Sequence, residues 1–187
     1  MGFLPNTIYH INQKDPANPD YIYNYGCAVC AAGQAAAYYA EKQYTVSDCK
    51  EAGLYSEGSA SCSWNWNTNK STNVSVGSTY TEVNSTDVNY ATIRDEIDNG
   101  HPPIICLTYG EHTHWVMVYA YTSAGDTTSR ILVADPADGN KKTLKKAIQY
   151  SFTELDQENL DLVEITRIKT TAKKQKILIF SIIIKII

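Results

Sequence analysis

An alanine-rich segment at Cys27–Ala40, CAVCAAGQAAAYYA, is the feature that most constrains this fold. Alanine is the best helix former, so we predict a helix over these residues. The segment is apolar or small on nearly every face, whereas a surface helix keeps a polar face, so this helix should be buried. Its small side chains also let neighbouring elements approach closely. The sequence therefore predicts a central buried helix near the N-terminus.

Two further helices are predicted before the strands begin. Ser47 is a suitable N-cap for a short helix near Asp48–Leu54. A longer helix is capped by Thr86 or Asp87 and stops at Asn99-Gly100.

Apolar runs typical of strands occur later in the chain. The connections between the first three are short, which favours antiparallel pairing. Helices first and strands second indicate an α+β fold, with the central N-terminal helix packed on a C-terminal antiparallel sheet. The predicted strands are Pro103–Tyr109, His114–Tyr121, Arg130–Ala134 and Leu160–Ile168.

Two other stretches lack these patterns. Residues 1–26 contain three prolines and are predicted to be extended and irregular. Residues 56–86 are rich in Ser, Asn, Thr and Gly, and we interpret them as a long loop with a short strand near Asn73–Val76.

Size and charge exclude several classes of protein. The 187 residues are 43% hydrophobic and 19% charged, which fits one folded domain. The formal net charge of −4 argues against a nucleic-acid partner, because such binding relies on clustered Lys and Arg. Basic residues do gather at Lys141–Lys146 and Lys169–Lys176, which we interpret as a solvated turn and a tail.

Cys27 is the first candidate for chemistry. It follows Gly26 at the first turn of the buried helix, where free N–H groups and the helix dipole favour a thiolate. The same N–H groups can hold an oxyanion. A buried structural cysteine is the alternative interpretation of this residue taken alone.

His114 and Asp135 add the partners that a nucleophilic thiol needs. His114 stands at the start of an alternating strand, and Asp135 ends the next one. A hairpin brings these two positions together, so the carboxylate can orient the imidazole that exchanges a proton with the thiol. A surface histidine and an Asp-Pro turn are the alternatives. Gln13, in the extended segment YHINQ, is a candidate for completing an oxyanion hole.

These stretches together resemble the papain-like cysteine peptidases of the double-glycine leader type and their stand-alone bacterial relatives. The resemblance is carried, in order, by INQ, GCAVCAAGQAAAYYAEKQYTVSDC, IDNGHPPIICLTY, and HTHWVMVYAY followed by ILVADPADG. It implies a papain-like fold and a thiol protease that hydrolyses peptide amide bonds. By position it assigns Cys27 as nucleophile, His114 as base, Asp135 as the residue orienting the histidine, and Gln13 as the oxyanion donor.

The sequence departs from this family at one position and offers competing residues at two others. Ala28 stands where the family usually has glycine after the nucleophile, which removes no reacting group. Cys30 is a second candidate nucleophile, but Cys27 lies at the helix start after glycine. His112 competes with His114, but His114 directly precedes the alternating strand.

Other classes of function remain open at this point. Cys27-x-x-Cys30 with His112-x-His114 could supply four zinc ligands, although the Ala-rich helix lacks a knuckle turn. A redox dithiol would call for a parallel βαβ order that is not predicted. A catalytically inactive papain-like module that binds peptides is a third alternative, and acyl transfer by the same residues is a fourth.

The remaining expectations concern organisation and surroundings. We predict a peptidase domain at 1–170 and a hydrophobic, basic tail at 171–187, whose apolar part is too short to span a bilayer. We expect a monomer with a peptide or protein substrate, no cofactor and no metal. For the tail, an interfacial membrane anchor, a partner-binding strand and an aggregation-prone segment without function stay open as alternatives. No secretory signal is visible at the start, so the compartment stays open: extracellular or cell-surface if a leader was removed, otherwise cytoplasmic. An odd count of five cysteines leaves at least one unpaired, and Cys49 could pair with Cys62 in an exported protein.

Overall fold

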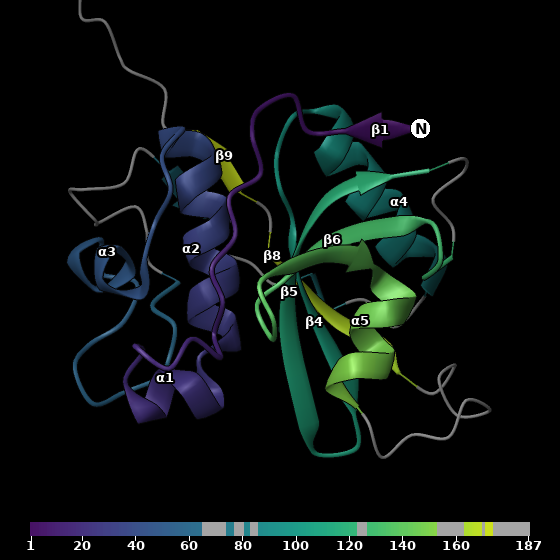
Figure 1. The fold of residues 1–187 in the computed structure, drawn as a ribbon. Helices are drawn as coiled ribbons and strands as arrows, with labels where there is room; N and C mark the ends of the chain where they lie inside the picture. The colour runs from purple at the N-terminus through teal and green to yellow at the C-terminus, as the bar shows by residue number, and fades with distance from the viewer. Residues whose placement is uncertain are drawn as a thin grey trace, which may run out of the picture.

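The structure, a computed structural model, describes residues 1–64, 74–76, 81–82, 86–122, 127–152, 163–169 and 171–173. Helices α1, α2 and α3 gather on one side of it and the strands of the main sheet on the other (Figure 1). Helix α5 lies against the sheet on the side away from α2 and α3 (Figure 1). The predicted α+β class is confirmed by this arrangement.

The predicted central helix forms as α2, Cys27–Ala40, with the predicted bounds. Eleven of its residues are buried, in keeping with its lack of a polar face. Other elements approach α2 closely at Gly33, because a Cβ there would collide with the Cys49 sulfur and with Ile11. Small residues thus allow α3 and the N-terminal segment to pack against the helix backbone.

The other helices frame α2 and the sheet. Their bounds are α1 Asp20–Tyr25, α3 Val46–Glu51, α4 Thr86–Asp98 and α5 Leu144–Ser151. In the described part of the chain, none of the helices is long and apolar enough to cross a membrane.

The main sheet has seven described strands, and every pairing in it is antiparallel. Its strand order is β3-β8-β4-β5-β6-β7, and β1 pairs with β5 outside this path. A separate pair joins β2 to β9. The strands are β1 Gly2–Phe3, β2 Val74–Val76, β3 Thr81–Glu82, β4 Ile104–Tyr109, β5 His112–Tyr121, β6 Ile131–Asp135, β7 Asn140–Thr143, β8 Glu164–Lys169 and β9 Thr171–Lys173.

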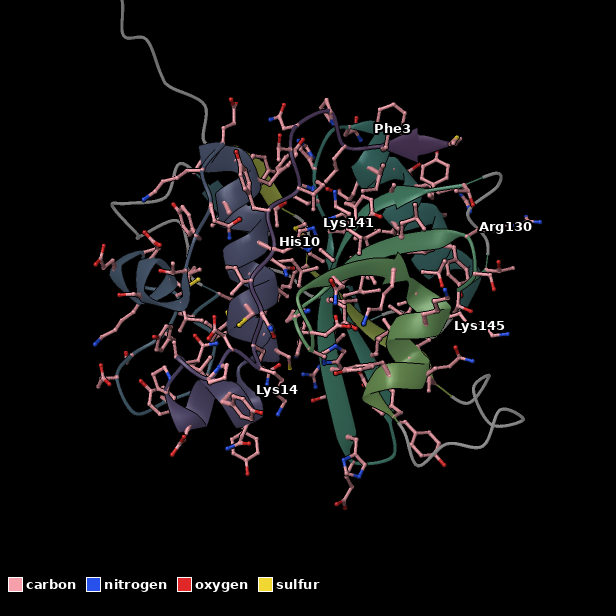
Figure 2. All side chains as sticks on the ribbon, in the orientation of Figure 1. Phe3, His10, Lys14, Arg130, Lys141 and Lys145 are labelled. Carbon is pink, nitrogen blue, oxygen red and sulfur yellow. The ribbon has the colours of Figure 1, made fainter. Side chains whose placement is uncertain are left out.

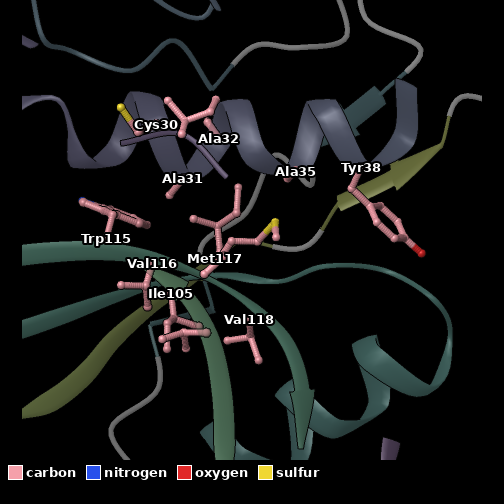
Figure 3. Packing of buried hydrophobic residues seen from close by; sticks show 14 of the residues in the cluster. Cys30, Ala31, Ala32, Ala35, Tyr38, Ile105, Trp115, Val116, Met117 and Val118 are labelled. Carbon is pink, nitrogen blue, oxygen red and sulfur yellow. The ribbon is translucent and has the colours of Figure 1, made fainter. Parts of the chain in front are cut away.

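The core lies between α2 and the centre of the sheet. Trp115 and Met117 of β5 point towards Ala31 and Ala35 of α2, whereas Val116 points away (Figure 3). This alternation follows the twofold period of a strand. It fixes which face of β5 packs against the helix and which face carries His114.

Several predicted elements were wrong in position or kind. Residues 1–26 are not irregular throughout, because α1 begins after Pro19, a residue that the start of a helix accommodates. The cap of α3 is Thr45 rather than Ser47, since Thr45 and Asp48 form a reciprocal capping box. Lys141–Lys146 is not a turn but the end of β7 and the start of α5.

The C-terminal predictions are only partly within the described residues. Strand β9 begins at Thr171, and the rest of the predicted tail, from residue 174 on, lies outside them. The long predicted loop at 56–86 is described only at 56–64, 74–76, 81–82 and 86.

Candidate active site

Cys27 is the first residue of α2 and is half-buried. Helix α1 ends only two residues earlier, at Tyr25, so the chain turns between the helices at a single residue, Gly26. A Cβ at Gly26 would lie 2.6 Å from the Ile22 carbonyl oxygen, closer than two unbonded atoms tolerate. Glycine is therefore needed to start α2 this close to α1, and it fixes where the thiol is presented.

The thiol meets β5 where that strand has a free edge. Pairing between β5 and β6 is described only from Met117 onward, so His114 and Trp115 extend beyond the end of β6. The backbone N–H of Trp115 donates a hydrogen bond to the Cys27 sulfur, and the His114 ring forms a second one with it. The early end of β6 thus opens the space in which the helix start reaches the histidine.

Asp135 is the last residue of β6 and is fully buried. Its Oδ1 lies 2.8 Å from Nε2 of His114, and the same oxygen accepts the backbone N–H of Ala137 at 2.9 Å. Because Nε2 is engaged by the carboxylate, Nδ1 is the ring nitrogen left for the Cys27 thiol. His114 therefore joins the thiol to the carboxylate.

The charges of this trio reinforce one another. Burial raises the pKa of the Cys27 thiol, but the hydrogen bond and positive charge of His114, together with the N–H groups of Trp115 and Ala28, outweigh burial and leave that pKa below its usual value. Burial likewise lowers the pKa of His114, but the hydrogen bonds with Asp135 and Cys27 raise it to about 9. Burial also raises the pKa of Asp135, and the hydrogen bond with His114 more than offsets this effect. A thiolate–imidazolium pair is the protonation state that these shifts favour at neutral pH.

This trio sits within the region that matches a known family. Residues 6–159 match the Peptidase_C39 like family. The chain belongs to this family. The resemblance drawn from the sequence is thereby confirmed, as is the papain-like fold, and membership supports a cysteine peptidase in general. The chain matches none of the proteins with curated descriptions.

Gln13, the fourth predicted site residue of this Peptidase_C39 like protein, is buried beside the turn that follows β6. Its backbone N–H donates to the Pro136 carbonyl at 2.8 Å. Its side-chain Nε2 donates to the Tyr23 carbonyl at 3.1 Å, which ties it to α1. An amide nitrogen carries two hydrogens, so this bond leaves one of them for another acceptor. The segment before α1 is thus held to both sides of the site.

The competing residues lie in different surroundings from Cys27 and His114. Cys30 is fully buried, and burial raises its pKa well above that of a free thiol. His112 is exposed near the tip of the β4–β5 hairpin, opposite Tyr109.

All five cysteines are free thiols in the structure, including Cys49 and Cys62. The described residues contain no group of three or more His, Cys, Asp or Glu placed to hold a metal, so the structure gives no support to the zinc alternative.

Lys142 of β7 is a neighbour of the site that the sequence did not single out. Its Nζ lies 3.1 Å from Oδ2 of Asp135 and 2.8 Å from Oδ2 of Asp138. Its side chain is only 10% exposed. The one signal in the sequence is the four-residue spacing of Asp138 and Lys142, but this spacing indicates an ion pair only in a helix. A hairpin register is needed to place Lys142 beside Asp135.

Proposed function

We propose that this protein is a cysteine peptidase that hydrolyses peptide amide bonds, with Cys27 as nucleophile, His114 as general base and acid, and Asp135 orienting the histidine. The observation that carries the proposal is the position of His114 between the Cys27 thiol and the Asp135 carboxylate, 2.8 Å from the latter. Membership of a peptidase family points the same way.

The first half of the proposed reaction forms an acyl-enzyme. The Cys27 thiolate attacks the peptide carbonyl carbon, and the imidazolium of His114 then protonates the leaving amine. Asp135 stabilises the imidazolium and holds Nδ1 towards the sulfur. An acyl group is now bound to the Cys27 sulfur.

The second half returns the enzyme to its starting state. Neutral His114 removes a proton from water, the hydroxide attacks the thioester, and the acid product leaves as the thiolate and imidazolium re-form. The same acyl-enzyme could pass its acyl group to an amine instead of water, which would be acyl transfer.

We propose two sources of hydrogen bonds for the developing oxyanion. The first N–H groups of α2 have no acceptor within the helix, and the N–H of Ala28 is directed to the Cys27 sulfur. The second hydrogen of the Gln13 amide is the other donor that we propose. The tie to the Tyr23 carbonyl would fix this amide before substrate binds.

The test compares two thiols in one helix. Iodoacetamide should label Cys27 fast at pH 6–7, because its pKa is lowered, and should label Cys30 slowly, because its pKa is raised. Cys27→Ala should abolish both the fast labelling and the cleavage of a quenched fluorescent peptide library, whereas Cys30→Ala should keep most of both.

Each alternative gives a different result in the same experiment. Fast labelling of Cys27 with peptide binding but no cleavage would favour the inactive binding module. Release of amide products only when an amine is added would favour acyl transfer. Equal, slow labelling of both thiols would contradict the proposed nucleophile.

A further inference from the structure

Lys142 is the charged side chain beside the proposed catalytic residues to which the reaction above gives no role. It lies opposite Val133 in the β6–β7 pairing, and Val133 shares a sheet face with Asp135. Ala134, next to Asp135, points to the other face, and so does Met117, which lies opposite it. His114 is three residues before Met117, so it points to the same face as Asp135. Three adjacent strands therefore present His, Asp and Lys in one row.

The two oxygens of Asp135 are divided between its neighbours. Oδ1 bonds to His114 and to the N–H of Ala137, whereas Oδ2 faces the Lys142 ammonium at 3.1 Å. Asp135 is fully buried, and burial would strongly disfavour its charged form without such partners. The ammonium is thus the ion-pair partner of the oxygen that His114 does not use.

The surroundings of Lys142 keep it in place and charged. Asp138 accepts a hydrogen bond from it at 2.8 Å, and the Tyr150 ring of α5 lies 4.3 Å from its Nζ. Burial alone would lower the pKa of Lys142, but the two carboxylates raise it above its usual value. The charged groups that face this row are therefore Cys27, His114, Asp135 and Asp138, with Tyr150 as the aromatic cover.

We propose that Lys142 is a positioning residue that holds the second oxygen of Asp135 and sets the pH range in which the thiolate–imidazolium pair exists. The proposal rests on the proposed function of Cys27, His114 and Asp135. The ammonium repels the imidazolium through the shared carboxylate and lowers the pH at which His114 loses its proton. Its removal should leave the carboxylate oriented by Ala137 but raise that pH.

The test uses three variants and two readouts. Lys142→Met removes the charge, Lys142→Gln keeps a hydrogen-bond donor without the charge, and Lys142→Arg keeps the charge. The loss of the imidazolium proton of His114 is followed by its ring proton shift in NMR. The formation of the Cys27 thiolate, at lower pH, is followed by the pH dependence of iodoacetamide labelling. Lys142→Met and Lys142→Gln should move the His114 titration upward by about one pH unit, and Lys142→Arg should leave it in place.

Lys141 provides the matched control. It is the preceding residue of β7, lies on the opposite sheet face from Lys142, and has its Nζ 5.4 Å from the Tyr119 ring centroid. It lies near His10 (Figure 2), whose pKa is lowered first by burial and then by the charge of Lys141. Lys141→Met makes the same change in net charge without touching Asp135, so it should leave the His114 titration unchanged.

The outcomes separate this proposal from the one on which it rests. If wild-type Cys27 is not labelled fast at pH 6–7, the proposed nucleophile is wrong. If it is labelled fast but Lys142→Gln titrates as the wild type, or shifts downward, Lys142 has no such role and only the present proposal is overturned. If Lys142→Met does not fold, Lys142→Gln decides, and an equal upward shift in Lys141→Met would also overturn the proposal.

Discussion

Removing the carboxylate of Asp135 should disrupt the proposed ion pair between the Cys27 thiolate and the His114 imidazolium. Burial lowers the pKa of His114, and the hydrogen bond that His114 donates to Asp135 is the largest of the effects that nevertheless raise it from 6.5 to about 9. At 1.36 kcal/mol per pH unit, this difference is worth about 3 kcal/mol of preference for the imidazolium. Without the carboxylate, burial should leave His114 neutral at neutral pH, and Cys27 should remain a thiol.

Two substitutions divide this effect into charge and hydrogen bond. Asp135→Ala removes both, so we expect iodoacetamide labelling of Cys27 at pH 6.5 to slow by about a hundredfold, which is the equivalent of about 3 kcal/mol. Asp135→Asn removes the charge, but its amide oxygen still accepts the Nε2–H of His114. We therefore expect a smaller loss, roughly tenfold, in that variant.

The assay must distinguish this effect from loss of the fold. Labelling is followed at the Cys27 position by mass spectrometry, with circular dichroism and thermal unfolding measured on the same samples. Asp138→Asn is the matched control, because it removes a carboxylate that also binds Lys142 but does not touch His114. Wild-type labelling rates in a folded Asp135→Ala protein would refute the coupling inferred here.

Three further predictions concern the thiol, the oxyanion donor and the packing of α2. In the wild type, the pH profile of Cys27 labelling should have its midpoint below 9, since His114 outweighs the effect of burial and lowers the pKa of the thiol; a midpoint at or above 9 would contradict this. Gln13→Ala should lower kcat by roughly 10²-fold with little change in KM on a cleaved peptide, if its amide binds the oxyanion only in the transition state. Gly33→Ala should lower the free energy of unfolding in urea by about 1–3 kcal/mol, because the added methyl collides with the Cys49 sulfur; an unchanged midpoint would contradict the close packing there.

Some parts of this protein follow from local rules and were therefore predictable from the sequence. The bounds of α2 follow from alanine content and from Gly26 before it, and both act over a few neighbouring residues. The sequence also indicates that His114 and Asp135 are neighbours, because a hairpin joins the strands that carry them, and their side chains lie 2.8 Å apart. The alternating run after His114 likewise predicts strand β5.

Other parts depend on register and packing between segments that are distant in the chain. Helix α1 and strand β7 lack strong local patterns, and the structure places them where the predictions had irregular chain or a turn. Helix α5 does have local signals, a Thr143 cap and buried Leu144, Ala147 and Ile148 at helical spacing, which the predictions missed. The contact of Cys27 with His114 spans 87 positions (114 minus 27), and it arises where β6 ends and leaves an edge of β5 open.

The sequence by itself determined the central helix, the α+β order and the residue types that the proposed chemistry uses. Only the tertiary structure decided which lysine of the basic run Lys141–Lys146 faces the site, because neighbouring residues of a strand point to opposite faces. That choice follows from the pairing register, because a shift of one residue would turn Lys141 instead of Lys142 towards the site. The register in turn depends on contacts with the rest of the sheet.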